Sequence, residues 1–76
     1  MKYTKNIGIK LKLLGFEHCA TGYSGDDVTQ DVWVKGSIVV AVKHRDKMVH
    51  VHIKNTDKAN IKSLDQLKQL DKLINK

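Results

Sequence analysis

The sequence predicts an α+β fold, a four-stranded antiparallel meander sheet with N- and C-terminal helices packed on one face. Two patterns predict it. Residues 37–54 show a period-two pattern in β-branched side chains, which is typical of a β-hairpin. Residues 61–74 repeat leucine and isoleucine at helical spacing. The 76 residues contain no proline or linker, so we expect one small domain over residues 1–76 with the element order α-β-β-β-β-α.

The first segment, residues 4–14, fits two structures. Ile7, Leu11 and Leu14 have helical spacing, and Gly15 is a suitable residue to end a helix. The same segment also alternates apolar residues with glycine and lysine, as a strand would. We favour the helix because the Leu-Leu-Gly ending is a natural stop, and the strand remains the alternative.

Two strands are expected next. Residues 16–23 form the first, with His18 and Ala20 on one side, and residues 30–35 form the second. A polar Ser-Gly-Asp-Asp run between them indicates a turn or loop. Lys35–Gly36 then suits a two-residue hairpin turn into the period-two region.

The two hairpin turns fix the expected strand register. A turn at Lys35–Gly36 pairs Trp33 with Ile38, and a turn at Arg45–Asp46 pairs Val42 with Val49. Both registers place the same set of large apolar side chains on one face. This predicted core face consists of Trp33, Ile38, Val40, Val42, Val49, Val51 and Ile53.

After a polar connection over residues 55–60, a closing helix is expected, whose apolar stripe consists of Ile61, Leu64, Leu67, Leu70, Leu73 and Ile74. Ser63 is the expected N-cap, because its hydroxyl can accept a hydrogen bond from a backbone amide of the first turn. The leucine stripe of this helix would cover the core face of the sheet.

Net charge and cysteine content limit the kinds of partner and the cellular compartment that we expect for this protein. The formal net charge is +6, and of 14 basic residues only Arg45 is arginine. Such a surface favours anionic partners, although lysine lacks the planar fork that suits bidentate phosphate contacts. Cys19 is the only cysteine and excludes an internal disulfide, so we expect a reducing, cytoplasmic location. No segment approaches the roughly 20 apolar residues of a membrane span.

The second face of the predicted sheet is the leading candidate for a binding surface. We call it the outer sheet face, and in the expected register it carries Val32, Val34, Val39, Ala41, Met48 and His50. An exposed apolar patch marks an interaction site. We therefore expect a small non-enzymatic interaction module that forms a homodimer or docks a protein partner. The alternative is that the first helix covers this face.

A nucleic-acid-binding function is the second hypothesis. Its expected contacts are the basic residues on and beside the central hairpin, namely Lys43, Arg45, Lys47 and Lys54. A small RNA-cleaving enzyme that uses a strand histidine such as His50 as acid and base is a further alternative.

No metal or cofactor is expected. His50 and His52 point the same way from one strand, but a closed site needs further ligands. Cys19, His18 and His44 have no familiar ligand spacing, and no nucleotide-binding or hydrolase motif is present. We expect Cys19 to be a buried small hydrophobe.

Overall fold

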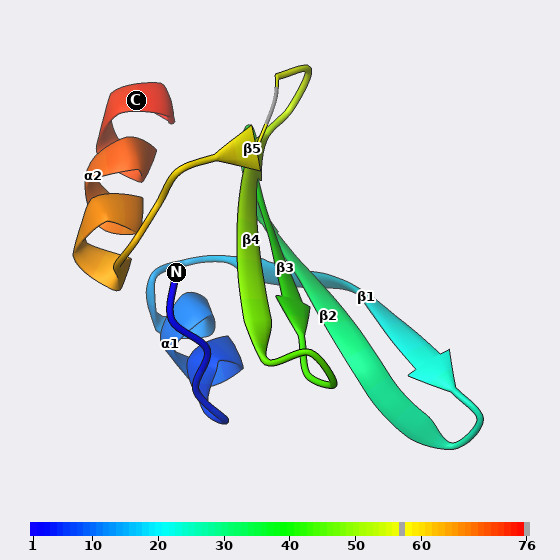
Figure 1. Cartoon of the computed structure of the whole chain (residues 1–76). Coiled ribbons are helices and arrows are strands. Elements are labelled where there is room, and N and C mark those ends of the chain that lie inside the picture. Colours follow the sequence, from blue (N-terminus) through cyan, green and yellow to red (C-terminus); the bar gives the residue numbers. More distant parts are fainter. Residues whose placement is uncertain (57, 76) are drawn as a thin grey trace.

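The computed structural model describes residues 1–56 and 58–75, and it confirms the α+β fold with an antiparallel meander sheet (Figure 1). Its elements are α1 (Ile7–Leu13), β1 (Glu17–Ser24), β2 (Asp27–Lys35), β3 (Ile38–Lys43), β4 (Met48–Ile53), β5 (Lys58–Ala59) and α2 (Leu64–Ile74). The strands follow one another in chain order across the sheet. The two-residue β5 was not predicted and lies within the expected polar connection.

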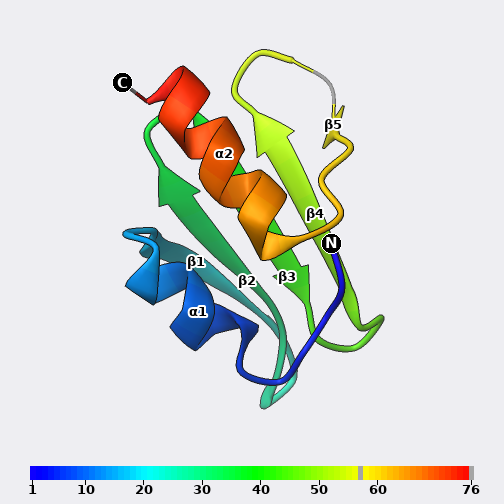
Figure 2. The same ribbon diagram turned by 90° about the vertical axis from the view of Figure 1, so that its left-hand side faces the viewer.

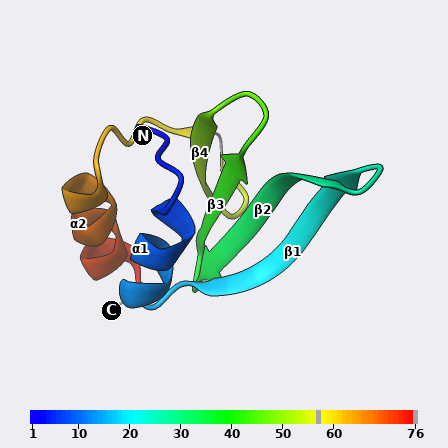
Figure 3. The same ribbon diagram turned by 90° about the horizontal axis from the view of Figure 1, so that it is seen from below.

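Both helices cover the same face of the sheet, as predicted. In Figure 2, α1 lies over the β1–β2 side and α2 over the β3–β4 side. Figure 3 shows α1 and α2 on one side of the sheet, and no helix of the described residues lies on the other. The end of β1 and the beginning of β2, which meet at the turn between Ser24 and Asp27, project past both helices as a two-stranded ribbon that we call the arm (Figure 1).

The hydrophobic core lies between the helices and the sheet. Its buried side chains, within the described residues, are all apolar: Ile7, Leu11, Phe16, Ile38, Val40, Val42, Val49, Val51 and Leu67. Trp33 packs against this cluster but is only partly buried. The alternation of buried and partly exposed residues along β3 and β4 confirms the period-two prediction.

Residues next to the helices explain where α1 ends and where α2 begins. Residues 7–13 are helical, so the helical prediction for the first segment is correct, although the helix begins at Ile7. Gly15 follows it with φ of 95°, a conformation that glycine adopts without strain. At α2 the Ser63 hydroxyl accepts a hydrogen bond from the Gln66 amide at 3.2 Å, which confirms the predicted N-cap.

One of the two predicted registers is correct. β3 and β4 pair Val42 with Val49, as expected. The β2–β3 register differs by two residues, because Trp33 pairs with Val40 rather than Ile38. The turn uses Gly36 and Ser37, and Gly36 supplies the positive φ of 56°. A shift of two leaves every side chain on its predicted face.

The prediction that His18 and Ala20 share a face is wrong. His18 pairs with Trp33 and Ala20 pairs with Val32, and an irregularity in the ladder lies between them. The extra residue, Cys19, is a β-bulge that reverses the alternation. His18 therefore lies on the helix side and Ala20 on the outer side. Cys19 itself is exposed, which corrects the expectation that it is buried.

A polar clasp fixes the end of α2 to the β2–β3 turn. Lys35 Nζ donates to Asp71 Oδ2 at 2.6 Å and to the Leu14 carbonyl at 2.9 Å. Asn75 accepts from the Ser37 amide at 3.1 Å and donates to the Lys35 carbonyl at 2.9 Å. These bonds connect both helices to β2, so they set the position of α2 over the sheet.

Candidate functional sites

The outer sheet face faces away from both helices (Figure 3). The strand register places its members on three adjacent strands, with Val32 opposite Ala41 and Ala41 opposite His50. Val34 pairs with Val39 in the neighbouring row. All six predicted residues, Val32, Val34, Val39, Ala41, Met48 and His50, are therefore contiguous. The aliphatic members from β2 and β3 are partly exposed.

Two features at the margin of this face are relevant to binding. Met48 is the most accessible of the six, with 47% of its surface exposed, and it pairs with Lys43. The six residues themselves carry no carboxylate and no ammonium group, and charged residues of this face, Lys43 beside Met48 and Glu17 beside Val34, lie at its margin. It can therefore approach another apolar surface without burying a lysine or carboxylate charge at its centre.

The four basic residues of the nucleic-acid hypothesis lie at both ends of β4: Lys43, Arg45 and Lys47 at or beside the β3–β4 turn, and Lys54 after the other end. Lys43 and Arg45 line a shallow depression of about 310 Å³ beside the arm, together with Asp46. Lys47 lines a different groove along β4. Lys54 follows the opposite end of β4, about 20 Å away for a strand of six residues.

A polar cluster that the sequence did not predict lies on the helix side, centred on Asp31 of β2. Its carboxylate forms hydrogen bonds with two imidazoles: His44 Nε2 is 2.7 Å from Oδ2, and His18 Nε2 is 2.8 Å from Oδ1. The hydroxyl of Thr21 donates to Oδ1 at 3.0 Å and is 2.9 Å from His18 Nε2. One carboxylate therefore orients two histidines from different parts of the chain.

The cluster continues from His44 to Tyr3. The Tyr3 hydroxyl is 2.9 Å from His44 Nδ1, and the two rings meet edge to face. Because an ionised Asp31 only accepts hydrogen bonds, His44 carries its proton on Nε2. A neutral His44 then accepts the Tyr3 hydroxyl proton at Nδ1. Both nitrogens of His44 are engaged, and the ring joins the N-terminal segment to β2.

His18 differs from His44 in having one outward nitrogen. Its Nε2 is held by Asp31, whereas no described residue forms a hydrogen bond with its Nδ1. The side chain is 42% exposed, and the ring packs edge to face on Trp33 with centroids 5.0 Å apart. A carboxylate on one nitrogen and solvent at the other is an arrangement that suits a general base.

The electrostatics of the cluster favour an ionised carboxylate. Burial raises the pKa of Asp31, but hydrogen bonds from His44, His18 and Thr21 together outweigh burial and lower it below its ordinary value. In the clasp, the hydrogen bond from Lys35, aided by Asn75, lowers the pKa of Asp71.

The cluster is a hydrogen-bond network rather than a metal centre. Within residues 1–56 and 58–75, no group of three or more His, Cys, Asp or Glu side chains is arranged to hold a metal ion. The two Nε2 atoms that a metal would need are directed at carboxylate oxygens. Across the same described residues, no helix is long and apolar enough to cross a membrane.

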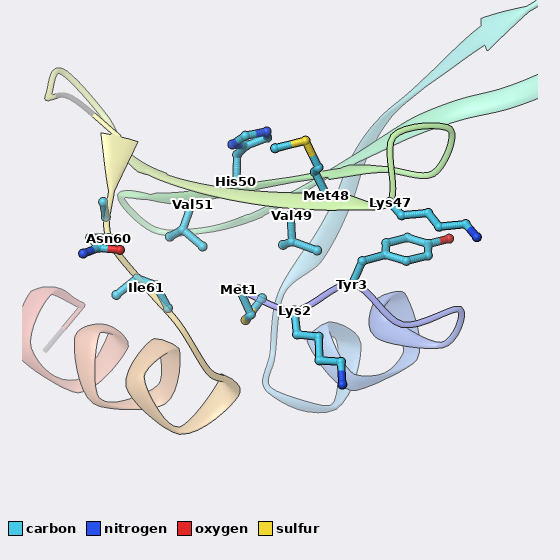
Figure 4. Close-up of a pocket in the computed structure, with 11 residues that line it drawn as sticks. Met1, Lys2, Tyr3, Lys47, Met48, Val49, His50, Val51, Asn60 and Ile61 are labelled. Atoms are coloured by element: carbon cyan, nitrogen blue, oxygen red, sulfur yellow. The ribbon is translucent and has the colours of Figure 1, made fainter.

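A groove of about 680 Å³ runs along the edge of β4 that faces away from β3 (Figure 4). Its lining comprises Met1, Lys2, Tyr3, Lys47, Met48, Val49, His50, Val51, Ala59, Asn60 and Ile61. In Figure 4, Val49 and Val51 point toward Met1, whereas Met48 and His50 point to the outer sheet face. Tyr3 and Ile61 lie at opposite ends.

Comparisons with known proteins give no relative for this chain. No protein-family model, curated protein or solved structure matches it.

Sequence reasoning missed the cluster for identifiable reasons. Tyr3 and His44 are 41 residues apart, so no local spacing links them. The bulge at Cys19 brings His18 to the side of Asp31, and nothing in the period-two pattern indicates it. The one available signal was Asp31 itself, a carboxylate among the helix-facing positions of β2.

Proposed function

We propose that this protein is a non-enzymatic interaction module that self-associates through its outer sheet face. The supporting observation is that both helices lie on the other face, so no helix or strand of residues 1–56 and 58–75 packs on the contiguous apolar side chains of β2 and β3 (Figure 3). Packing one sheet on another, about 10 Å apart, would remove these side chains from water.

A second copy is the occupant that the charges favour. Each chain carries a net charge of +6, but the six contact residues contain no lysine or carboxylate. Lys43 and Lys54 lie at the margin, where salt screens their mutual repulsion. Two copies can therefore meet face to face without opposing like charges at the centre of the contact.

The size of the patch sets the expected affinity. Three strands about 4.8 Å apart give a contact at the small end of specific interfaces. We expect a reversible dimer with a dissociation constant in the micromolar range. A cytoplasmic location belongs to the same proposal, since a reducing compartment keeps the exposed thiol of Cys19 from forming an unwanted disulfide.

Sedimentation equilibrium over a range of protein concentrations, at low and moderate salt, tests this function. We expect the mass to approach that of a dimer and the association to strengthen with salt, because repulsion between cationic copies is screened. Val39→Lys and Met48→Lys should give monomers. Leu13→Lys is the matched control, since Leu13 is 83% exposed on α1, far from this face. A monomer at all concentrations, or equal loss with Leu13→Lys, contradicts the proposal.

A second candidate, metal-independent cleavage of RNA, is supported by the Asp31–His18 pair. In this reaction His18 Nδ1 takes the proton of a ribose 2′-hydroxyl and O2′ bonds to phosphorus. The P–O5′ bond then breaks, and the leaving oxygen takes a proton from solvent. Of the predicted phosphate contacts, Lys43 and Arg45 line one depression beside the arm.

An RNA oligonucleotide incubated with the protein and a chelator tests this candidate. We expect a 2′,3′-cyclic phosphate product that is lost in His18→Gln and retained in His50→Gln. His50 was the histidine favoured from the sequence, and it lies on the opposite face of the sheet. Absence of product, or equal activity in both variants, removes this candidate.

A further inference from the structure

The edge of β4 is only partly covered by β5. β5 pairs with Val51 and His52 alone. It ends in a tight turn in which the Ile61 amide donates to the Ala59 carbonyl at 3.1 Å. This turn directs the chain away from the sheet toward α2. Within the described residues, no strand lies beside Met48 and Val49.

The backbone of Val49 opens onto that uncovered edge. In an antiparallel pair, successive residues direct their amide and carbonyl to alternate sides. The Lys54 amide donates to the Ser37 carbonyl on the β3 side, so residues of even number in this strand face β3. Val49 therefore presents its N–H and C=O to the groove, in line with β5. An exposed strand edge of this kind is a template for another strand.

The groove has an apolar part and a cationic end. Val49, Met1 and Ile61 supply apolar surface, as Figure 4 shows. Lys2 and Lys47 lie toward the Tyr3 end (Figure 4), and none of the lining residues is acidic. Because the cations are at one end of the groove, we expect it to favour a peptide segment that carries carboxylates at the corresponding end.

We propose that this groove binds an extended peptide segment of another protein, which adds to β4 as an antiparallel strand and carries acidic residues at its C-terminal end. β5 runs from His52 toward Val51 along β4, and a peptide that continues in that direction has its C-terminal end beside Lys47. Apolar β-branched residues precede the acidic ones, opposite Val49. This site is separate from the outer sheet face, so it does not depend on self-association.

The polar cluster holds one wall of the groove in place. Tyr3 lines the groove, and its hydroxyl is fixed by His44, which is in turn fixed by Asp31. A wall positioned before binding reduces the entropy that binding must remove. The cluster thereby acts as a positioning element for the peptide site.

A labelled six-residue probe peptide, Thr-Val-Thr-Val-Asp-Glu with blocked ends, tests the proposal by fluorescence anisotropy and by amide chemical shifts. We expect saturable binding with the largest shifts at Met48, Val49 and Ile61. N-methylation of the central peptide bonds should weaken binding at least tenfold, because it removes the strand hydrogen bonds. A peptide with lysines in place of the two acidic residues should also bind at least tenfold more weakly.

Two lysines at opposite ends of β4 provide matched variants. Lys47→Asn removes the charge at the proposed site and suits the φ of 54° at this position. We expect a several-fold loss of affinity, whereas Lys54→Asn should bind as the unaltered protein does. Val39→Lys separates the two proposals, because Val39 lies on the outer sheet face and does not line the groove, so this monomeric variant should bind the peptide normally.

The opposite results would overturn the peptide site. These are no saturable binding, shifts confined to β2 and β3, equal binding of the N-methylated peptide, or equal losses for Lys47→Asn and Lys54→Asn. Loss of peptide binding in Val39→Lys would place the peptide on the outer sheet face instead.

Discussion

His44 Nε2 lies 2.7 Å from Oδ2 of Asp31, and this contact joins the turn between β3 and β4 to the middle of β2. His44 directly follows β3, and β3 already pairs with the strand that contains Asp31, so the contact adds little to the topology. Its effect is on orientation. It fixes the His44 ring so that Nδ1 receives the Tyr3 hydroxyl, and it thereby attaches the N-terminal segment to the sheet.

Removal of the shared carboxylate should loosen three contacts at once. We expect Asp31→Asn to lower the stability by about 1–3 kcal/mol, because hydrogen bonds to a charged group are replaced by neutral ones. For a domain of this size that corresponds to a fall in melting temperature of at least about 4 °C. Asp46→Asn, which removes an exposed carboxylate from the β3–β4 turn, is the control. Equal melting temperatures for the two variants would show that the cluster contributes nothing to stability.

Stability should fall in acid. The pKa values of Asp31 and Asp71 are both lower in the folded protein than the ordinary value of 3.8. The folded state therefore binds fewer protons than the unfolded state near and below this pH. Their contribution is fully present above about pH 5 and is lost as the pH falls through 3.8 and below. Urea denaturation as a function of pH measures it, and the slope should flatten when both are changed to Asn.

Gly36 should be more sensitive to substitution than Gly25. Both have positive φ, 56° and 63°, so alanine at either position costs about 1–2 kcal/mol of backbone strain. At Gly36 a Cβ would also collide with the Asn75 side chain, whereas at Gly25 it meets open space. We expect Gly36→Ala to be the more destabilising because it also disturbs the clasp on α2. Equal free energies of unfolding would contradict this role of Asn75.

Tyr3→Phe should weaken peptide binding in the groove while lowering the stability of the protein only slightly. The variant keeps the ring and removes only the hydroxyl bound to His44, so the expected cost in stability is about 1 kcal/mol. Affinity for the probe peptide should nevertheless fall several-fold, because the wall is no longer held in place. Tyr23→Phe is the control, since Tyr23 is exposed on the arm. Unchanged affinity in Tyr3→Phe would show that the polar cluster does not position the groove wall for peptide binding.

The sequence predicted the elements and the faces of the sheet because both depend on local periodicity. Alternation through β3 and β4 assigned Val40, Val42, Val49 and Val51 to the core, and all four are buried. The register of the β2–β3 hairpin depended on which residues form the turn. Gly36 can occupy either position of a two-residue turn, so the pattern did not distinguish the two registers.

The remaining features depend on contacts between distant residues. The bulge at Cys19 has no signature in hydrophobicity, because the edge strand that contains it is exposed over most of its length. The cluster of Asp31, His18 and His44 needs that bulge, and the β4 groove needs the turn that ends β5. Neither site could therefore be inferred from spacing along the chain.

The arm formed by the distal ends of β1 and β2 has a consequence for how the molecule opens. Beyond the reach of the helices it is a two-stranded ribbon, and such ribbons are marginally stable alone in water. Its amide protons near Gly25 should exchange with deuterium through local fraying, without any unfolding of the rest. Those of β3, enclosed between two strands and covered by α2, should exchange only when the whole chain unfolds. Asp31 directly follows Gln30, the first residue of β2 that pairs with β3, so we expect the polar cluster to mark the boundary between locally fraying and globally unfolding amides.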